Sequence, residues 1–234
     1  NRLLRYNDKV KQLLSSFAVT HCLLNRYKKQ ITEVYRQQSE LKAGGGEMEL
    51  LEWIHNIDAQ ILLFIQQYLR SDLFTWLWKG ITFLGDGGWF WIVLGLLFLF
   101  PKKTRKAGVT ALLALAIGAV VTNLCLKDLV ARIRPYDSVE GLVPLVARLK
   151  DYSFPSGHTC ASFACAGVYY KAFPGKWGKA AMVLAVLIAL SRLYVGVHYP
   201  TDVLAGALVG TFSALAALKL EHALVRYYEE RKAK

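Results

Sequence analysis

The chain has 234 residues, of which 54% are hydrophobic and 20% are charged, and its mean hydropathy is +0.29. This mixture is too apolar for an ordinary soluble domain and too charged for membrane spans alone, so it indicates a protein with both kinds of part. The net charge of +12 is spread along the chain without a basic and aromatic RNA-binding motif, which argues against a nucleic-acid partner.

Residues 1–43 carry apolar side chains at the spacing of a coiled coil. Two core positions of a heptad recur along this segment, and nearly all of their occupants are apolar: Leu3, Val10, Phe17, Leu24, Ile31 and Gln38 at one, and Tyr6, Leu13, Thr20, Tyr27, Val34 and Leu41 at the other. This pattern predicts a coiled-coil-like helix through which the chain self-associates. The alternative is a basic amphipathic helix on anionic lipid, which fits the charge but not the strict spacing.

A glycine run follows this segment. Gly44-Gly45-Gly46 breaks the helix, and Glu47-Met48 then reads as a new beginning. A flexible glycine joint before a methionine is typical of an engineered junction, so we interpret residues 1–46 as a fused helix and linker outside the functional argument. A natural helical arm is the alternative.

Residues 47–86 are predicted to form an amphipathic helical lead-in to the membrane. The apolar residues between Ile57 and Leu84 are interrupted by polar ones, and tryptophans lie nearby: Asp58, Gln60, Gln66, Gln67, Arg70 and Asp72, with Trp53, Trp76 and Trp78. This composition favours one or two interfacial helices over a clean span. The glycine-rich residues 85–88 predict a turn that closes the segment.

Residues 87–225 contain five apolar segments, each near or slightly below the ~20 residues needed to cross hydrocarbon. These candidate spans are 87–101, 107–127, 157–172, 179–197 and 200–222. We therefore expect an all-α fold, a polytopic membrane bundle of five to six helices. Residues 226–234 form a basic tail.

The distribution of basic residues predicts the orientation of the spans. Lysines and arginines follow the first, third and last spans, which alternation places on one side, and the excess of positive charge identifies that side as the cytoplasm. The loops 128–156 and 197–199 then face outward. We expect a multi-pass protein of the plasma membrane with any site on these loops facing the extracytoplasmic side.

Charged residues border these apolar segments. Lys127 and Arg134 are seven residues apart, two helical turns, so we expect them on one helix face with Pro135 ending the helix. Downstream, Ser191-Arg192 is followed by His198 and Asp202. Membrane helices tolerate such groups only at their ends or facing a polar cavity, so their clustering indicates a functional site.

The stretch 152–159 predicts a helix N-terminus. Ser156 is placed to cap the helix, and the free N–H groups of Gly157 and His158 would form a cradle for a phosphate. Pro-Ser-Gly also marks ordinary helix beginnings, so this motif gains meaning only beside the cations around it.

Together these residues predict phosphate chemistry. One lysine and two arginines suit a phosphate with several negative charges, and two histidines can supply a nucleophile and a proton donor. Asp202, four residues after His198, can hold the other nitrogen of that ring. The sequence offers no carboxylate cluster for Mg²⁺, so we expect no metal and no cofactor.

At this point the sequence resembles the type 2 phosphatidic acid phosphatase superfamily. The family signature is Lys, six residues, Arg-Pro, then Pro-Ser-Gly-His, then Ser-Arg, five residues, His, three residues, Asp. Every spacing is kept here: Lys127 to Arg134-Pro135, Pro155-Ser156-Gly157-His158, and Ser191-Arg192 to His198 and Asp202. The resemblance covers about residues 57–222. No clear hydrophobic span precedes Ile57, whereas several six-span relatives have one.

The resemblance implies a role for each motif residue. His198 would be the nucleophile that forms a phosphohistidine, Asp202 its orienting partner and His158 the general acid. The phosphate cradle would consist of Lys127, Arg134, Ser156, Gly157 and Arg192. The family is metal-independent.

The resemblance also implies a membrane lipid phosphatase. Small bacterial members dephosphorylate undecaprenyl diphosphate, phosphatidylglycerol phosphate or phosphatidic acid, and undecaprenyl diphosphate is the substrate we favour. Vanadium haloperoxidases share the motifs but are soluble, which the apolar segments argue against. Two further readings are a non-catalytic lipid-phosphate binder or transporter, which would need no nucleophile, and polar residues that only anchor helix ends, which matching spacing at every motif argues against.

Overall fold

The computed structural model describes residues 47–232, and this part of the chain contains helices and no strand. The chain divides after Ile54 into two compact units, and the site described below lies within the second, His55–Lys234. The predicted coiled coil and glycine linker lie outside the described residues. The all-α prediction is confirmed for the residues that the structure describes.

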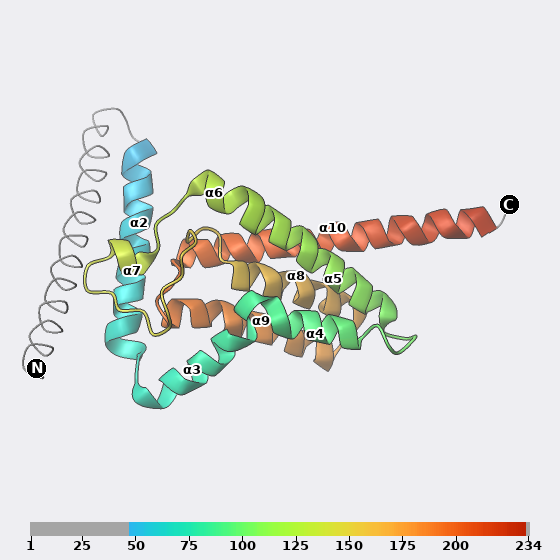
Figure 1. The fold of residues 1–234 in the computed structure, drawn as a ribbon, viewed down its shortest axis with the longest axis horizontal. Coiled ribbons are helices and arrows are strands. Elements are labelled where there is room, and N and C mark those ends of the chain that lie inside the picture. The colour runs from blue at the N-terminus through green and yellow to red at the C-terminus, as the bar shows by residue number, and fades with distance from the viewer. Residues whose placement is uncertain (1–46, 233–234) are drawn as a thin grey trace, which may run out of the picture. The chain divides into compact units, whose positions relative to one another are not determined.

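Figure 1 shows the helices in chain order. They are α2 (Glu47–Phe64), which continues into a π-helical turn (Ile65–Leu69), α3 (Asp72–Leu84), a short 3-10 turn (Asp86–Gly88), α4 (Trp89–Leu97), α5 (Arg105–Ala119), a second π-helical segment (Val120–Leu126), α6 (Lys127–Val130), α7 (Pro135–Ser138), α8 (Gly157–Ala172), α9 (Lys176–Tyr194) and α10 (Pro200–Lys232).

Helix α8 is the centre of the bundle, because α5, α9 and α10 all pack against it (Figure 1). Its contact with α10 is close because α10 presents glycines. A Cβ atom added at Gly206 would lie 2.6 Å from the carbonyl oxygen of Ser156, and one at Gly210 would lie 2.4 Å from that of Cys160. Small residues allow membrane helices to approach in this way. The N-termini of α8 and α10 are consequently held together, and Ser156 N donates to Asp202 O at 3.0 Å.

Within residues 47–232, three stretches are long and apolar enough to cross a membrane: Arg105–Ser138, Lys176–Tyr194 and Pro200–Lys232. A fourth arises if α3 and Asp86–Leu97, which meet at a bend of 44°, form one broken span. The protein is therefore a multi-pass membrane protein. Helix α8, predicted as a span over 157–172, has 16 residues, and the count of five to six spans stays a prediction.

The turn predicted at residues 85–88 is present, with Gly87 and Gly88 at φ 57° and 71°. Three of the polar residues that suggested interfacial helices upstream of it, Asp58, Gln66 and Arg70, make hydrogen bonds within the protein. Gln66 Nε2 donates to Gly141 O at 2.8 Å, and its Oε1 accepts from Val143 N at 2.8 Å. Gln66 thus connects the π-helical turn after α2 to the loop after α7.

The predicted single helix through Lys127 and Arg134 is wrong. The helix ends at Val130, Ala131 has a positive φ of 48°, and Arg134 is extended with ψ 151°. Pro135 begins α7 and does not end a helix. Proline disfavours the α region for Arg134 before it, and in a continuous helix its ring would clash with the carbonyl of Ala131 four residues earlier. The two cations reach the same site from different local structures.

Candidate active site

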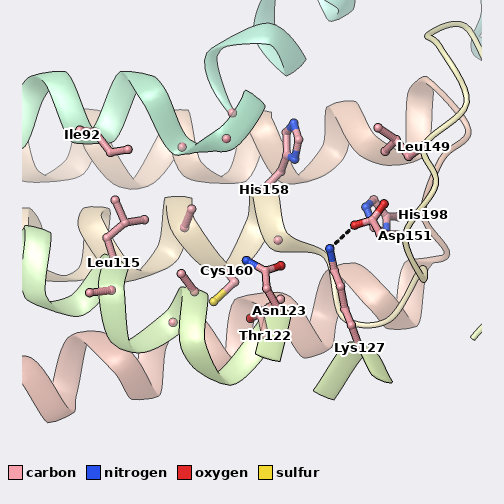
Figure 2. Close-up of a pocket in the computed structure, with 18 of the residues that line it drawn as sticks. Ile92, Leu115, Thr122, Asn123, Lys127, Leu149, Asp151, His158, Cys160 and His198 are labelled. Atoms are coloured by element: carbon pink, nitrogen blue, oxygen red, sulfur yellow. Dashed lines mark hydrogen bonds and ion pairs between the residues drawn. The ribbon is translucent and has the colours of Figure 1, made fainter. Parts of the chain in front are cut away.

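A cavity of about 570 Å³ lies at the N-terminus of α8. One group of its lining residues is polar: Asn123, Lys127, Arg134, Asp151, His158 and His198. Another group is apolar and comes from α4 and α5: Ile92, Leu112, Leu115, Ala116 and Ala119. Figure 2 shows Lys127, Asp151 and His198 close together, with Ile92 and Leu115 farther along the cavity. The cavity can therefore accept a ligand with a polar head and an apolar chain.

The structure brings the predicted site residues to this one place, from segments far apart in sequence. Five of them line the cavity: Lys127, Arg134, Gly157, His158 and His198. The other three are buried and do not line it: Ser156 caps α8, Asp202 faces His198, and Arg192 contacts Thr82 of α3.

His198 lies in the turn between α9 and α10 and is buried. Its Nδ1 is 3.5 Å from Asp202 Oδ2, a long contact of the kind that tightens in substrate complexes, and its Nε2 is 3.3 Å from Arg134 Nη1. Burial, above all, lowers the pKa of His198 to about 3, and the charges of Arg192 and Arg134 act in the same direction, against the carboxylate of Asp202. The imidazole is therefore neutral near pH 7, as a nucleophile must be.

Asp202, in the first turn of α10, is fixed by donors that the sequence analysis did not identify. Tyr199 N donates to its Oδ2 at 2.9 Å, Ser153 Oγ donates to the same oxygen, and Arg132 Nη1 donates to Oδ1 at 2.7 Å. Arg132 also pairs with Asp58 of α2 at 2.8 Å. The carboxylate that faces His198 is thus held at both oxygens.

His158, in the first turn of α8, has a carboxylate partner too. Its Nε2 is 2.7 Å from Asp86 Oδ1, in the turn before α4. Gly85 allows this approach, because a Cβ atom there would lie 2.6 Å from His158 Cδ2 and 2.9 Å from Ile188 Cγ2. From the sequence, residues 85–88 were predicted only to form a turn. The predicted orientation was the available signal, since it places this turn on the same side of the membrane as His158.

The predicted N-cap of α8 is confirmed. Ser156 Oγ accepts from Thr159 N at 3.5 Å and from Thr159 Oγ1 at 3.0 Å. Beside this helix end, the position of a Cβ on Gly157 would be 3.8 Å from Asn123 Oδ1 and meet nothing closer. The helix N-terminus thus opens into the cavity, where its N–H groups and dipole favour an anion.

The cations meet at Asp151, another residue that the sequence analysis missed. Arg134 Nη2 donates to Asp151 Oδ1 at 2.7 Å, and Lys127 Nζ pairs with Oδ2. Burial alone would raise the pKa of Asp151, but the hydrogen bonds and charges of Lys127 and Arg134 outweigh burial and lower this pKa to about 2. Arg192 is turned toward Thr82, to whose Oγ1 its Nη1 donates at 2.6 Å, and its Nε has no hydrogen-bond partner among the described residues.

Comparison with known proteins agrees with this geometry. Residues 107–226 match the PAP2 superfamily. A Sulfolobus acidocaldarius protein named undecaprenyl-diphosphatase is 35% identical over 131 residues, 56% of this chain and 63% of that protein. A Bacillus licheniformis protein named bacitracin transport permease is 32% identical over 158 residues, 64% of this chain and 77% of that protein.

A solved structure of a PAP2 protein has a similar fold. The crystal structure of a transmembrane PAP2 type phosphatidylglycerolphosphate phosphatase from Bacillus subtilis has a TM-score of 0.61 and 28% sequence identity, over 73% of this chain and 87% of that chain. The family profile covers half of the chain, including every motif residue at its expected spacing. The resemblance predicted from the motifs is thereby confirmed, and the chain belongs to the PAP2 superfamily.

Proposed function

We propose that this protein is an integral membrane lipid phosphatase that works through a phosphohistidine, without a metal or cofactor. The observation that carries the proposal is the buried His198 imidazole, with Asp202 at its Nδ1 and the Arg134 guanidinium at its Nε2, in a cavity lined by two cations. A helix N-terminus and apolar side chains share the same cavity.

In the first step, His198 Nε2 attacks the phosphorus of the substrate. The N–P bond forms as the P–O bond to the leaving group breaks. Burial lowers the pKa of His158 to about 4 in the free protein, whereas the Asp86 carboxylate, and the charge of a bound phosphate, act in the opposite direction and favour the protonated ring. The protonated His158 of the substrate complex gives its proton to the departing oxygen. Asp202 stabilises the positive charge that develops on the His198 ring. Lys127, Arg134, Arg192 and the N–H groups at the start of α8 stabilise the charge on the transferred phosphoryl group.

In the second step, water hydrolyses the intermediate. His158, now neutral, takes a proton from the water as its oxygen bonds to phosphorus. The N–P bond then breaks, phosphate leaves the site, and the His198 imidazole returns to its neutral form. The same two histidines thus serve both steps: His158 donates a proton in the first step and accepts one in the second.

Undecaprenyl diphosphate is the substrate we favour. A lipid with a charged head and an apolar chain suits the two ends of the cavity, and one relative is named undecaprenyl-diphosphatase. Phosphatidylglycerol phosphate or phosphatidic acid is the alternative, and a structural relative named phosphatidylglycerolphosphate phosphatase supports that choice. We place the protein in the plasma membrane with the cavity on the extracytoplasmic side, on the strength of the positive-inside pattern.

A non-catalytic binder or transporter is the competing function, since one relative is named a transport permease. Such a protein would need the cations but neither the paired His198 and Asp202 nor a second histidine. The two functions therefore differ in what the loss of His198 does.

The test is phosphate release by the full chain in detergent micelles containing EDTA, across a panel of lipid phosphates. We expect turnover in EDTA, inhibition by orthovanadate and a phosphoenzyme trapped by acid quench of labelled substrate. His198→Ala should lower kcat at least ~10³-fold and abolish the phosphoenzyme, in line with the loss of a nucleophile.

His158→Ala is the matched comparison. Its deficit should shrink with an aryl phosphate, whose leaving group departs without a proton, whereas the deficit of His198→Ala should not. Turnover that disappears in EDTA and returns with Mg²⁺ would contradict the metal-free mechanism. Phosphoenzyme formed by His198→Ala would contradict the assignment of the nucleophile.

A further inference from the structure

The carboxylate of Asp151 lies between two cations of the proposed phosphate site. Its Oδ1 is 2.7 Å from Arg134 Nη2, its Oδ2 pairs with Lys127 Nζ, and its backbone oxygen accepts from Arg134 Nε at 2.9 Å. The side chain of Asp151 is 47% exposed, whereas those of Lys127 and Arg134 are 12% and 3% exposed. Figure 2 shows Asp151 reaching Lys127 at the polar end of the cavity.

A carboxylate in this place does two things for the free protein. It neutralises two cations that are mostly removed from water, which would otherwise carry a large desolvation cost. It also offers two oxygens to two donor groups, which is the arrangement that a phosphate would offer to the same donors. The lining of the cavity around it includes Gly157, His158 and His198.

We propose that Asp151 is the resident counter-anion of the phosphate site. Its carboxylate occupies the position between Lys127 and Arg134 in the free protein, and substrate phosphate displaces it. This competition lowers the affinity of the site for phosphate. This inference rests on the proposed function, in which Lys127 and Arg134 bind phosphate. Asp151 is free to leave because its side chain is half exposed and belongs to the irregular segment between α7 and α8.

Displacement has a consequence for turnover. Without a counter-anion, Lys127 and Arg134 would hold the product phosphate tightly, because each charge-assisted hydrogen bond to an anion is strong. The return of the tethered Asp151 carboxylate competes with the product at a high effective concentration. The residue therefore weakens phosphate binding and favours product release.

A structural role for Asp151 makes the opposite prediction. If the carboxylate served to hold Lys127 and Arg134 in position for phosphate, its removal would misplace both cations and weaken phosphate binding. The sign of the change in phosphate affinity separates the two roles.

The experiment compares the wild type with Asp151→Asn, as full chains in detergent micelles. The readouts are the inhibition constants of inorganic phosphate and orthovanadate and the change in Tm that phosphate produces. We expect the inhibition constants of Asp151→Asn to fall at least ~10-fold, which corresponds to about 1.4 kcal/mol. Its Tm without ligand should be lower than that of the wild type, and phosphate should raise that Tm by more.

Asp137→Asn is the matched control. Asp137 lies in α7, just before the segment that carries Asp151, and pairs with Arg148 at 2.9 Å, outside the cavity lining. Its inhibition constants should stay within about threefold of the wild type. Inhibition constants of Asp151→Asn that are unchanged or higher would overturn the proposal.

Two further measurements keep the test decisive. In the wild type, orthovanadate should speed hydrogen exchange of residues 149–152, and unchanged or slower exchange would overturn the proposal even if Asp151→Asn does not fold. The variant Arg134→Gln tests the proposed function on which this inference rests. If phosphate inhibits Arg134→Gln as strongly as it inhibits the wild type, the proposed phosphate site is refuted. If Arg134→Gln weakens inhibition by phosphate but Asp151→Asn leaves the inhibition constant unchanged, only the role proposed here for Asp151 is refuted.

Discussion

At the scale of single residues, His198 shows how burial and charge select one protonation state. The ring is 2% exposed, and nearby arginines oppose a further positive charge. Because the Arg134 guanidinium can only donate, the Nε2 that it faces keeps its lone pair, and the proton belongs on Nδ1, which faces Asp202. A fully solvated histidine side chain, in contrast, is partly protonated at neutral pH.

This difference predicts a pH dependence of stability. The folded pKa of His198, about 3, is below its unfolded value near 6.5. The unfolded chain therefore binds more protons between these values, so the stabilising contribution of neutral His198 is complete above pH 6.5 and declines as pH falls toward 3. Between pH 7 and pH 5, the wild-type Tm should fall by about 4 °C or more beyond that of His198→Gln. The Tm of each protein is measured in detergent at a series of pH values, as the temperature at which half of the protein is no longer soluble. Tm values of the wild type and of His198→Gln that change in parallel with pH would contradict the prediction.

The carboxylates around the site illustrate what a sequence does not reveal. The histidines, Lys127 and the arginines could be predicted because each belongs to a motif with fixed spacing. Asp86, Asp151 and Asp58 could not, because each acts singly, through a contact with a residue more than 15 positions away. Only the folded chain brings them to the cations and rings that they contact.

At the scale of elements, α2 extends the site beyond the region that defines the family. It contributes Asp58, whereas the family match begins at residue 107. Asp58 is buried and accepts from Arg132 Nη2 at 2.8 Å and from Thr201 N at 3.1 Å. Behind the neutral His198 ring, charges thus alternate along Asp202, Arg132 and Asp58. The last carboxylate balances Arg132, so that Asp202 keeps its negative charge available to His198.

Removing that balance should slow the reaction. We expect Asp58→Asn to lower kcat about 10-fold with little change in KM, because the unopposed charge of Arg132 would weaken the stabilisation of the His198 cation by Asp202. The double variant Asp58→Asn with Arg132→Gln should lose less than the product of the two single losses. Asp72→Asn, at the exposed start of α3, is the control. Strictly multiplicative losses would show that Asp58 only supports the fold.

The elements also show why local spacing can mislead. Lys127 and Arg134 were expected on one helix face, yet the chain leaves the helix at Ala131 and continues extended to Pro135. Spacing predicts a shared face only where the helix is continuous. In contrast, the cap at Ser156 depends on its immediate neighbours alone, and that prediction is confirmed.

At the scale of the whole molecule, composition and apolar segments were sufficient to predict an all-helical membrane protein. The number of spans was harder to predict, because α8 is short and central, and α3 and α4 are separated by a bend. Their apolar surfaces serve packing as well as lipid, so hydropathy alone does not distinguish a buried helix from a span. The motif loops meet because the glycines of α10 hold α8 close.

The orientation of this bundle decides which pool of substrate the cavity meets. Basic residues 102–106 lie at one end of α5, and the cavity lies toward its other end, at Lys127. If the basic end faces the cytoplasm, single cysteines placed at 138–150 should react with a membrane-impermeant thiol reagent in intact cells, and those at 102–106 should react only after lysis. The four native cysteines are first replaced by serine, because Cys125 is exposed and would report on its own. The reverse labelling pattern would place the site in the cytoplasm and remove outer-leaflet lipids from its substrates.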